Sequence, residues 1–225
     1  MFYEPGETQY DLKFRFLGIP VRVHPFFWLL SIFLGMSCPA KELLVWIGAV
    51  LISVLIHEMG HAIVLRSYGF LPRIVLYSFG GLTIHDRYTR RLLWYENILV
   101  SAAGPFAGFL LAALAYLLLC GNIPLFQTIF ASAFLKKILY MLIYINVAWG
   151  VFNLLPIFPL DGGNIARELC MHLSPRSGFA IALQISMVTA IIAALCFIHS
   201  GMFFGAFLFG WMAYSNWQML QYRQM

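Results

Sequence analysis

Long apolar runs separated by short polar segments are the feature that most constrains how this chain can fold. A helix needs about 20 apolar residues to span the roughly 30 Å hydrocarbon core of a bilayer. Five runs approach or exceed that length, and a shorter sixth run precedes them between two prolines: 43–65, 98–119, 138–155, 179–198, 202–220 and 26–36. The pattern predicts an all-α polytopic membrane protein with six transmembrane segments.

The composition supports a chain that is surrounded by lipid. Of its 225 residues, 62% are hydrophobic and 10% are charged, whereas soluble domains carry about 25% charged residues. The net charge of +5 comes from basic residues scattered between the apolar runs, so no nucleic-acid partner is expected. The four cysteines lack C-x-x-C spacing and are expected to act as small hydrophobes, although pairing of Cys38 with Cys120 stays open.

The basic residues also predict the orientation of the chain. Six crossings place both termini on one side, and assigning that side to the cytoplasm puts all but three of the 14 Lys and Arg residues there. The exceptions are Lys41, Lys136 and Lys137. This distribution follows the positive-inside rule, so we expect a multi-pass protein of a prokaryotic cell membrane with both termini in the cytoplasm.

Two segments have the alternation typical of strands. Basic and apolar residues alternate over residues 12–24, which predicts a ribbon within an interfacial N-terminal segment, residues 1–25. Residues 74–85 contain two β-prone runs separated by Gly80 and Gly81, a pattern that predicts a small membrane-associated β-hairpin.

The sequence His57-Glu58-Met59-Gly60-His61 places three chemically active side chains in one apolar run. Residues four apart share a helix face, so both imidazoles can bind one zinc ion, while Glu58 lies about 100° around the helix. In metalloproteases with this motif, the glutamate accepts a proton from the attacking water.

A catalytic zinc site needs three protein ligands, and two histidines leave it incomplete. The third candidate is Asp161, which follows a helix broken by Pro156 and Pro159 at membrane depth. Irregular backbone at that depth must face protein or a wet cavity. A glutamate ligand would have to be Glu96 or Glu168, which are predicted at helix ends and fit less well.

At three motifs the chain resembles the site-2 proteases, which are intramembrane zinc metalloproteases: HEMGH at 57–61, SAAGP at 101–105 and NLLPIFPLDG at 153–162. The resemblance implies one zinc per chain held by His57, His61 and Asp161, with Glu58 as catalytic base. Asn153 would lie near the metal and bind substrate or the oxyanion, although a helix-capping role competes with that assignment. The whole chain, 1–225, would be a single transmembrane metalloprotease domain, a minimal form without a PDZ or nucleotide-sensing domain.

The resemblance also implies transmembrane proteins as substrates. Their helices must unwind before cleavage, so replacement hydrogen bonds are needed. We expect an extended substrate to pair with the hairpin beside Gly80 and Gly81, along the strand edge at residues 76–78.

Other interpretations stay open. Zinc or ion transport would also place His and Asp near a broken helix, but no internal repeat is visible and a transporter does not need Glu58. A catalytically inactive membrane adaptor is the other alternative, and the oligomeric state is not predicted. The remaining candidates are expected to serve hydration or helix packing: His24, His85, His172, His199, Gly104 and Gly108.

Overall fold

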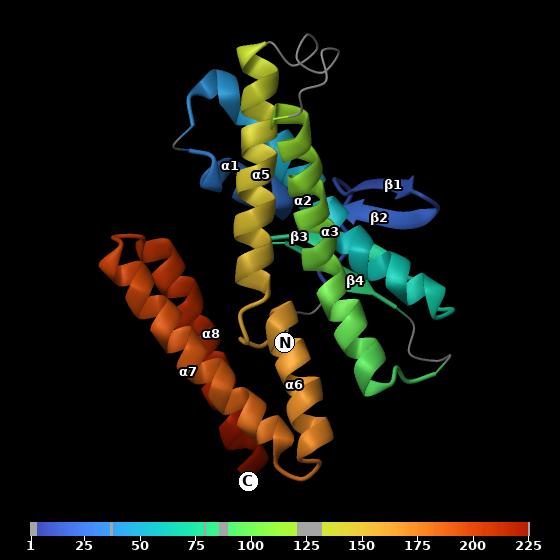
Figure 1. The fold of residues 1–225 in the computed structure, drawn as a ribbon, viewed down its shortest axis with the longest axis vertical. Helices are drawn as coiled ribbons and strands as arrows, with labels where there is room; N and C mark the ends of the chain where they lie inside the picture. The colour runs from blue at the N-terminus through green and yellow to red at the C-terminus, as the bar shows by residue number, and fades with distance from the viewer. Residues whose placement is uncertain (1–3, 37, 79, 86–89, 121–131, 225) are drawn as a thin grey trace. The chain divides into compact units, whose positions relative to one another are not determined.

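The structure, a computed structural model, describes residues 4–36, 38–78, 80–85, 90–120 and 132–224 (Figure 1). The described residues are mostly helical and include four short strands. In order, the elements are β1 Leu12–Phe16, β2 Ile19–Val23, α1 Pro25–Leu34, α2 Ala40–Ser67, β3 Arg73–Tyr77, β4 Gly80–Ile84, α3 Trp94–Cys120, α5 Ala133–Asn153, α6 Asp161–Leu173, α7 Gly178–His199 and α8 Phe203–Gln224. They divide into two compact units, Met1–Arg91 with Ala103–Gly150 and Leu92–Ala102 with Val151–Met225.

The first unit contains a four-stranded sheet in the order β1-β2-β3-β4. β1 and β2 form an antiparallel hairpin, β2 pairs in parallel with β3, and β3 and β4 form a second antiparallel hairpin. Both predicted strand segments are therefore confirmed, but they join in one sheet. β3 lies inside the sheet, and its Ile74, Val75 and Leu76 are each at most 1% exposed.

Two details of the predicted second hairpin are wrong. Gly80 and Gly81 do not form its turn, because they lie in β4 opposite Tyr77 and Leu76. The connection instead begins at Ser78, whose φ of 49° is left-handed. The expected open edge is also wrong at Leu76, which pairs with Val23 of β2 on one side and Gly81 of β4 on the other. Among the described strands, the outer edge of this hairpin belongs to β4.

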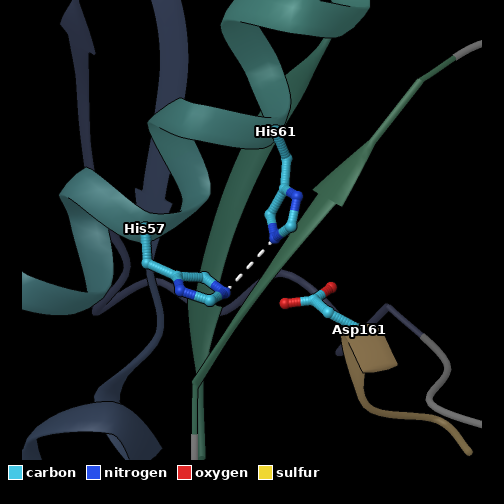
Figure 2. A group of neighbouring side chains, drawn as sticks. All are labelled: His57, His61 and Asp161. Atoms are coloured by element: carbon cyan, nitrogen blue, oxygen red, sulfur yellow. Dashed lines mark hydrogen bonds between the residues drawn. The ribbon is translucent and has the colours of Figure 1, made fainter. Parts of the chain in front are cut away.

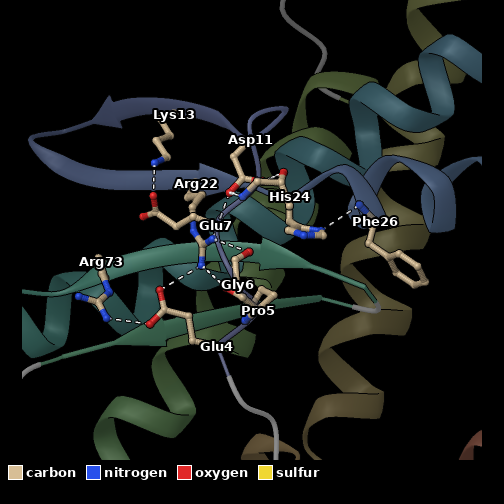
Figure 3. Close-up of polar contacts among 11 residues, drawn as sticks. Glu4, Pro5, Gly6, Glu7, Asp11, Lys13, Arg22, His24, Phe26 and Arg73 are labelled. Atoms are coloured by element: carbon tan, nitrogen blue, oxygen red, sulfur yellow. Dashed lines mark hydrogen bonds and ion pairs between the residues drawn. The ribbon is translucent and has the colours of Figure 1, made fainter.

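The N-terminal segment before β1 is tied across the sheet by a buried arginine (Figure 3). Arg22 of β2 is 7% exposed and forms ion pairs with Glu4 at 3.0 Å and Asp11 at 3.1 Å. It also donates to the carbonyls of Pro5 and Gly6. Glu4 binds Arg73 of β3 at 2.8 Å, so one carboxylate connects the segment to two strands.

The two ends of α2 are fixed by different contacts within the first unit. Near its start, Glu42 forms an ion pair with Lys137 of α5, which joins the N-terminal ends of these two helices. Near its end, Arg66 donates to the carbonyl of Leu17 in the β1–β2 turn at 3.0 Å. The helix therefore runs from the α5 N-terminus to the sheet.

The second unit is built on the helical hairpin of α7 and α8, preceded by α6. Its core contains Ile157, Ala190 and Phe209, all at most 5% exposed. At the start of α3, the Trp94 ring stacks on His172 of α6 with centroids 4.0 Å apart. Helix α6 was not expected from the sequence, because it is a short amphipathic segment rather than an apolar run.

Among the described residues, four helices are long and apolar enough to cross a membrane: α2, α3, α5 and α7. These candidate spans coincide with four of the six predicted segments. The predicted first segment forms the shorter apolar helix α1, and the last forms the 22-residue helix α8, which is long enough to span but less apolar than these four helices. All four cysteines are free thiols.

Candidate active site

The two motif histidines lie on one face of α2 and are buried. His57 is 3% and His61 is 7% exposed, and their Nε2 atoms are 3.2 Å apart (Figure 2). Facing ring nitrogens at this distance either share one proton or, when both are deprotonated, direct two lone pairs to the same point. The helix therefore presents two nitrogen ligands to one position, as the spacing predicted.

Gly104 of α3 lies directly against this pair. A Cβ atom built there would overlap the His61 ring and lie 2.9 Å from His57 Nε2. One helical turn later, a Cβ at Gly108 would lie 3.2 Å from Asn146 Oδ1. Gly108 thus serves packing, as expected, but Gly104 leaves open the space beside both Nε2 atoms. A small cation suits this space and these two donors.

Glu58 is 5% exposed and faces β4. The Thr83 hydroxyl lies 2.7 Å from its Oε2. A Cβ at Gly81 would lie 2.6 Å from Glu58 Cδ, so only glycine allows the strand to approach this closely. The neighbouring Gly80 faces Trp149, with a Cβ-to-ring distance of 3.0 Å. Of the two predicted substrate-site glycines, Gly81 therefore lies against the predicted base Glu58, and Gly80 lies against Trp149 instead.

A buried polar contact supports the histidine helix from α5. Asn146 donates from Nδ2 to the Ser53 hydroxyl at 2.8 Å and to the Leu142 carbonyl at 2.8 Å. Ser53 lies one helical turn before His57, and both Ser53 and Asn146 are at most 2% exposed. A buried hydrogen bond of this kind fixes the rotation of α2 about its axis.

In the second unit, Asp161 is the first residue of α6 (Figure 2). The backbone just before it is bound by two buried side chains of the α7–α8 hairpin. The Ser186 hydroxyl accepts from the Phe158 amide at 3.0 Å, and Asn216 Nδ2 donates to the Phe158 carbonyl at 2.7 Å. Asn153, the other predicted site residue of this unit, is the last residue of α5.

The other acidic and histidine candidates have roles elsewhere. Glu96 accepts from the Leu93 amide at 2.9 Å, and Glu168 pairs with Arg167 at 2.9 Å. The Nδ1 atom of His24 accepts from the Phe26 amide at the start of α1, and His85 lies edge-on to Phe70.

Sequence reasoning missed several residues around the site. Thr83 had a usable signal, because it lies two positions after Gly81 and so on the same face of a strand. Ser186 and Asn216 are polar residues inside apolar runs, a pattern that indicates a buried hydrogen bond. The sequence did not indicate that both bind the backbone of Phe158.

The sequence matches Peptidase family M50 over residues 45–131 and 119–195, which include the HExxH helix and Asp161. The chain belongs to Peptidase family M50. The resemblance to site-2 proteases is confirmed by a solved structure, the site-2 protease from Methanocaldococcus jannaschii. That structure has a TM-score of 0.63 and 25% identity, covering 94% of this chain and 95% of the other.

Two curated proteins are similar to most of this chain. A zinc metalloprotease of Methanocaldococcus jannaschii is 29% identical over 177 residues, 77% of this chain and 48% of the relative. Stage IV sporulation protein FB of Bacillus subtilis is 29% identical over 186 residues, 82% of this chain and 57% of the relative. The chain thus spans about half the length of these relatives.

Proposed function

We propose that this chain is an intramembrane zinc metalloprotease that hydrolyses peptide bonds within or near the transmembrane segments of other membrane proteins. The observation that carries the proposal is the buried His57–His61 pair on a long apolar helix, with the Glu58 carboxylate held beside it. Membership of a peptidase family supports the same chemistry.

The proposed metal is one zinc ion per chain, with His57, His61 and Asp161 as its ligands. This group has the donor types of a catalytic zinc site, and it could hold a metal ion (Figure 2). When bound, zinc supplies a Lewis acid that activates water and polarises a carbonyl group.

The proposed roles of the remaining side chains follow from their chemistry. The Glu58 carboxylate accepts a proton from the attacking water and then donates it to the departing amine. Asn153 carries an amide that suits a hydrogen bond to the substrate or to the developing oxyanion. Its position as the last residue of α5 is equally compatible with a role in ending that helix.

The proposed topology has six crossings with both termini in the cytoplasm of a prokaryotic cell. Contacts inside the first unit support this arrangement of charges. Lys137 joins the N-terminal ends of α2 and α5, near Lys41, whereas Arg66 and the basic strands lie at the other end of α2. The short α1 and the less apolar α8 would supply the remaining two crossings.

The proposed substrate site is the outer edge of β4, Gly80–Ile84. β3 is already paired on both sides from Ile74 to Leu76, so an unwound substrate would find its longer unpaired edge on β4. Substrate peptides methylated on alternate backbone amides test this proposal. One methylation register should raise KM about tenfold or more, and equal KM values for both registers would refute strand pairing.

The decisive experiment compares purified wild-type protein with Glu58→Gln on a panel of single-span membrane proteins, with and without a zinc chelator. Wild type should cleave at least one substrate only when zinc is present. Glu58→Gln should keep one zinc per chain and lose cleavage, because an amide cannot accept the proton. Cleavage by Glu58→Gln at the wild-type rate would refute the mechanism, and zinc uptake into proteoliposomes without cleavage would favour the transporter alternative.

A further inference from the structure

The face of β4 that contacts α2 carries two residues with complementary roles. Gly81 removes the side chain that would collide with Glu58, and Thr83 supplies a hydroxyl on the same side of the strand. β4 therefore approaches the Glu58 carboxylate closely because Gly81 has no side chain, and Thr83 of the same strand forms a hydrogen bond to it.

The Thr83 hydroxyl has two acceptors within reach on the same residue. Its oxygen lies 2.7 Å from Glu58 Oε2 and 3.1 Å from the Glu58 carbonyl oxygen. A hydroxyl donates only one proton, and a carboxylate is the stronger acceptor at the shorter distance. The hydroxyl thus donates to the carboxylate and fixes the direction in which its other oxygen points.

Building on the proposed function, we propose that Thr83 is a positioning residue that orients the Glu58 carboxylate from the strand that pairs with the substrate. The donor belongs to β4, so pairing of a substrate with the β4 edge restrains the same strand that holds the base. Binding of a substrate at the β4 edge would thus also restrain the Thr83 hydroxyl and, through its hydrogen bond, the orientation of the Glu58 carboxylate.

The first test compares Thr83→Val, which keeps the shape and removes the donor, with Thr83→Ser, which keeps the donor and removes a methyl group. Thr83→Val should lower kcat about tenfold or more, as expected for a lost hydrogen bond to a charged group. Its KM should stay within about twofold and its zinc content should equal that of wild type. Thr83→Ser should keep at least about half of the wild-type kcat.

Wild-type kcat in Thr83→Val, or an equal loss of kcat in both variants, would overturn the positioning role. An effect on KM alone would also overturn it, because it would assign Thr83 to substrate binding.

A thermal-unfolding cycle tests the contact without relying on activity. Thr83→Val should lower Tm more in the wild-type background than in Glu58→Met, where the carboxylate acceptor is absent and only the backbone carbonyl of residue 58 remains. Equal Tm shifts in both backgrounds would overturn the contact. If the cycle shows coupling but zinc-loaded wild type cleaves no substrate, the proposed protease function fails while the orientation of Glu58 by Thr83 stands.

Discussion

Gly104 has no side chain at the position where one would block the proposed metal site beside the two histidines. A methyl group at this position would overlap the His61 ring and crowd His57 Nε2. We expect Gly104→Ala to reduce zinc content to below about a tenth of wild type and to abolish cleavage. Metal analysis of the purified protein measures the first effect directly.

Gly48 of α2 supplies the matched control, because a Cβ there would meet no atom within 4 Å. Gly48→Ala should retain zinc and raise stability by up to about 1 kcal/mol, since alanine favours helix more than glycine does. Full zinc occupancy in Gly104→Ala would show that the space beside the histidines has no role in metal binding.

Asp11 gives the N-terminal segment a defined acid sensitivity. The Thr8 hydroxyl, together with the Thr8 amide and Arg22, lowers the pKa of Asp11 from 3.8 to about 2, against an opposing effect of burial. A lowered carboxyl pKa stabilises the folded state above the ordinary value, and this contribution is lost as the pH falls toward the folded-state value.

The Thr8 amide donates to the Asp11 carboxylate at 3.1 Å, so its protection factor, the intrinsic exchange rate divided by the observed rate, should stay constant from pH 7 to about pH 4 and fall as the pH approaches 2. Asp11→Asn should show a lower protection factor for this amide than wild type from pH 7 to about pH 4. Loss of protection between pH 6 and pH 5 in wild type would contradict this assignment.

At the scale of elements, the α7–α8 hairpin holds the backbone that leads into Asp161. Ser186 and Asn216 bind the amide and carbonyl of Phe158, and both side chains are at most 1% exposed. We expect Asn216→Leu to lower stability by about 1 to 3 kcal/mol, because a buried carbonyl loses its donor. If Asp161 is a zinc ligand, zinc affinity should fall about tenfold as well.

Gln218 on the same helix provides the control. Its amide donates to the Tyr214 hydroxyl on the exposed surface, so Gln218→Leu should change stability by less than about 0.5 kcal/mol and leave zinc affinity unchanged. Equal zinc affinity for Asn216→Leu and wild type would show that the hairpin does not position Asp161.

Helices with a long apolar run could be predicted from the sequence. Strand pairings between segments far apart in the sequence could not. Apolar length alone predicted α2, α3, α5 and α7. The parallel pairing of β2 with β3 joins segments separated by two helices, so no local pattern encodes it. Gly80 and Gly81 resembled a turn because their close approaches to Trp149 and to Glu58, respectively, exist only in the folded chain.

For the site, the motif spacing was sufficient to predict that His57 and His61 share one face and that Glu58 lies off that face. The residues that support them were harder to predict, because they act through contacts between different elements. Thr83 shares a strand face with Gly81, which is a usable signal, whereas Asn146 looks like an ordinary polar residue in sequence.

At the scale of the whole molecule, the distribution of charge predicts the topology. Single cysteines at positions 41 and 137 of a cysteine-free variant should react with an impermeant thiol reagent from outside intact cells. Cysteines at positions 13 and 73 should react only after the membrane is opened. Labelling of positions 137 and 13 from the same side would refute the proposed orientation.

The HExxH motif lies near the C-terminal end of α2, whose 28 residues run from Ala40 to Ser67. With a rise of about 1.5 Å per residue, His61 lies only about 9 Å from the end at Ser67, whereas His57 lies about 26 Å from Ala40. In the proposed topology, a substrate cut at this depth leaves only a few apolar residues on its cytoplasmic fragment, far fewer than the roughly 20 needed to span. If the chain cleaves substrates as proposed, that fragment would leave the bilayer without an extraction step, and the other product would stay anchored.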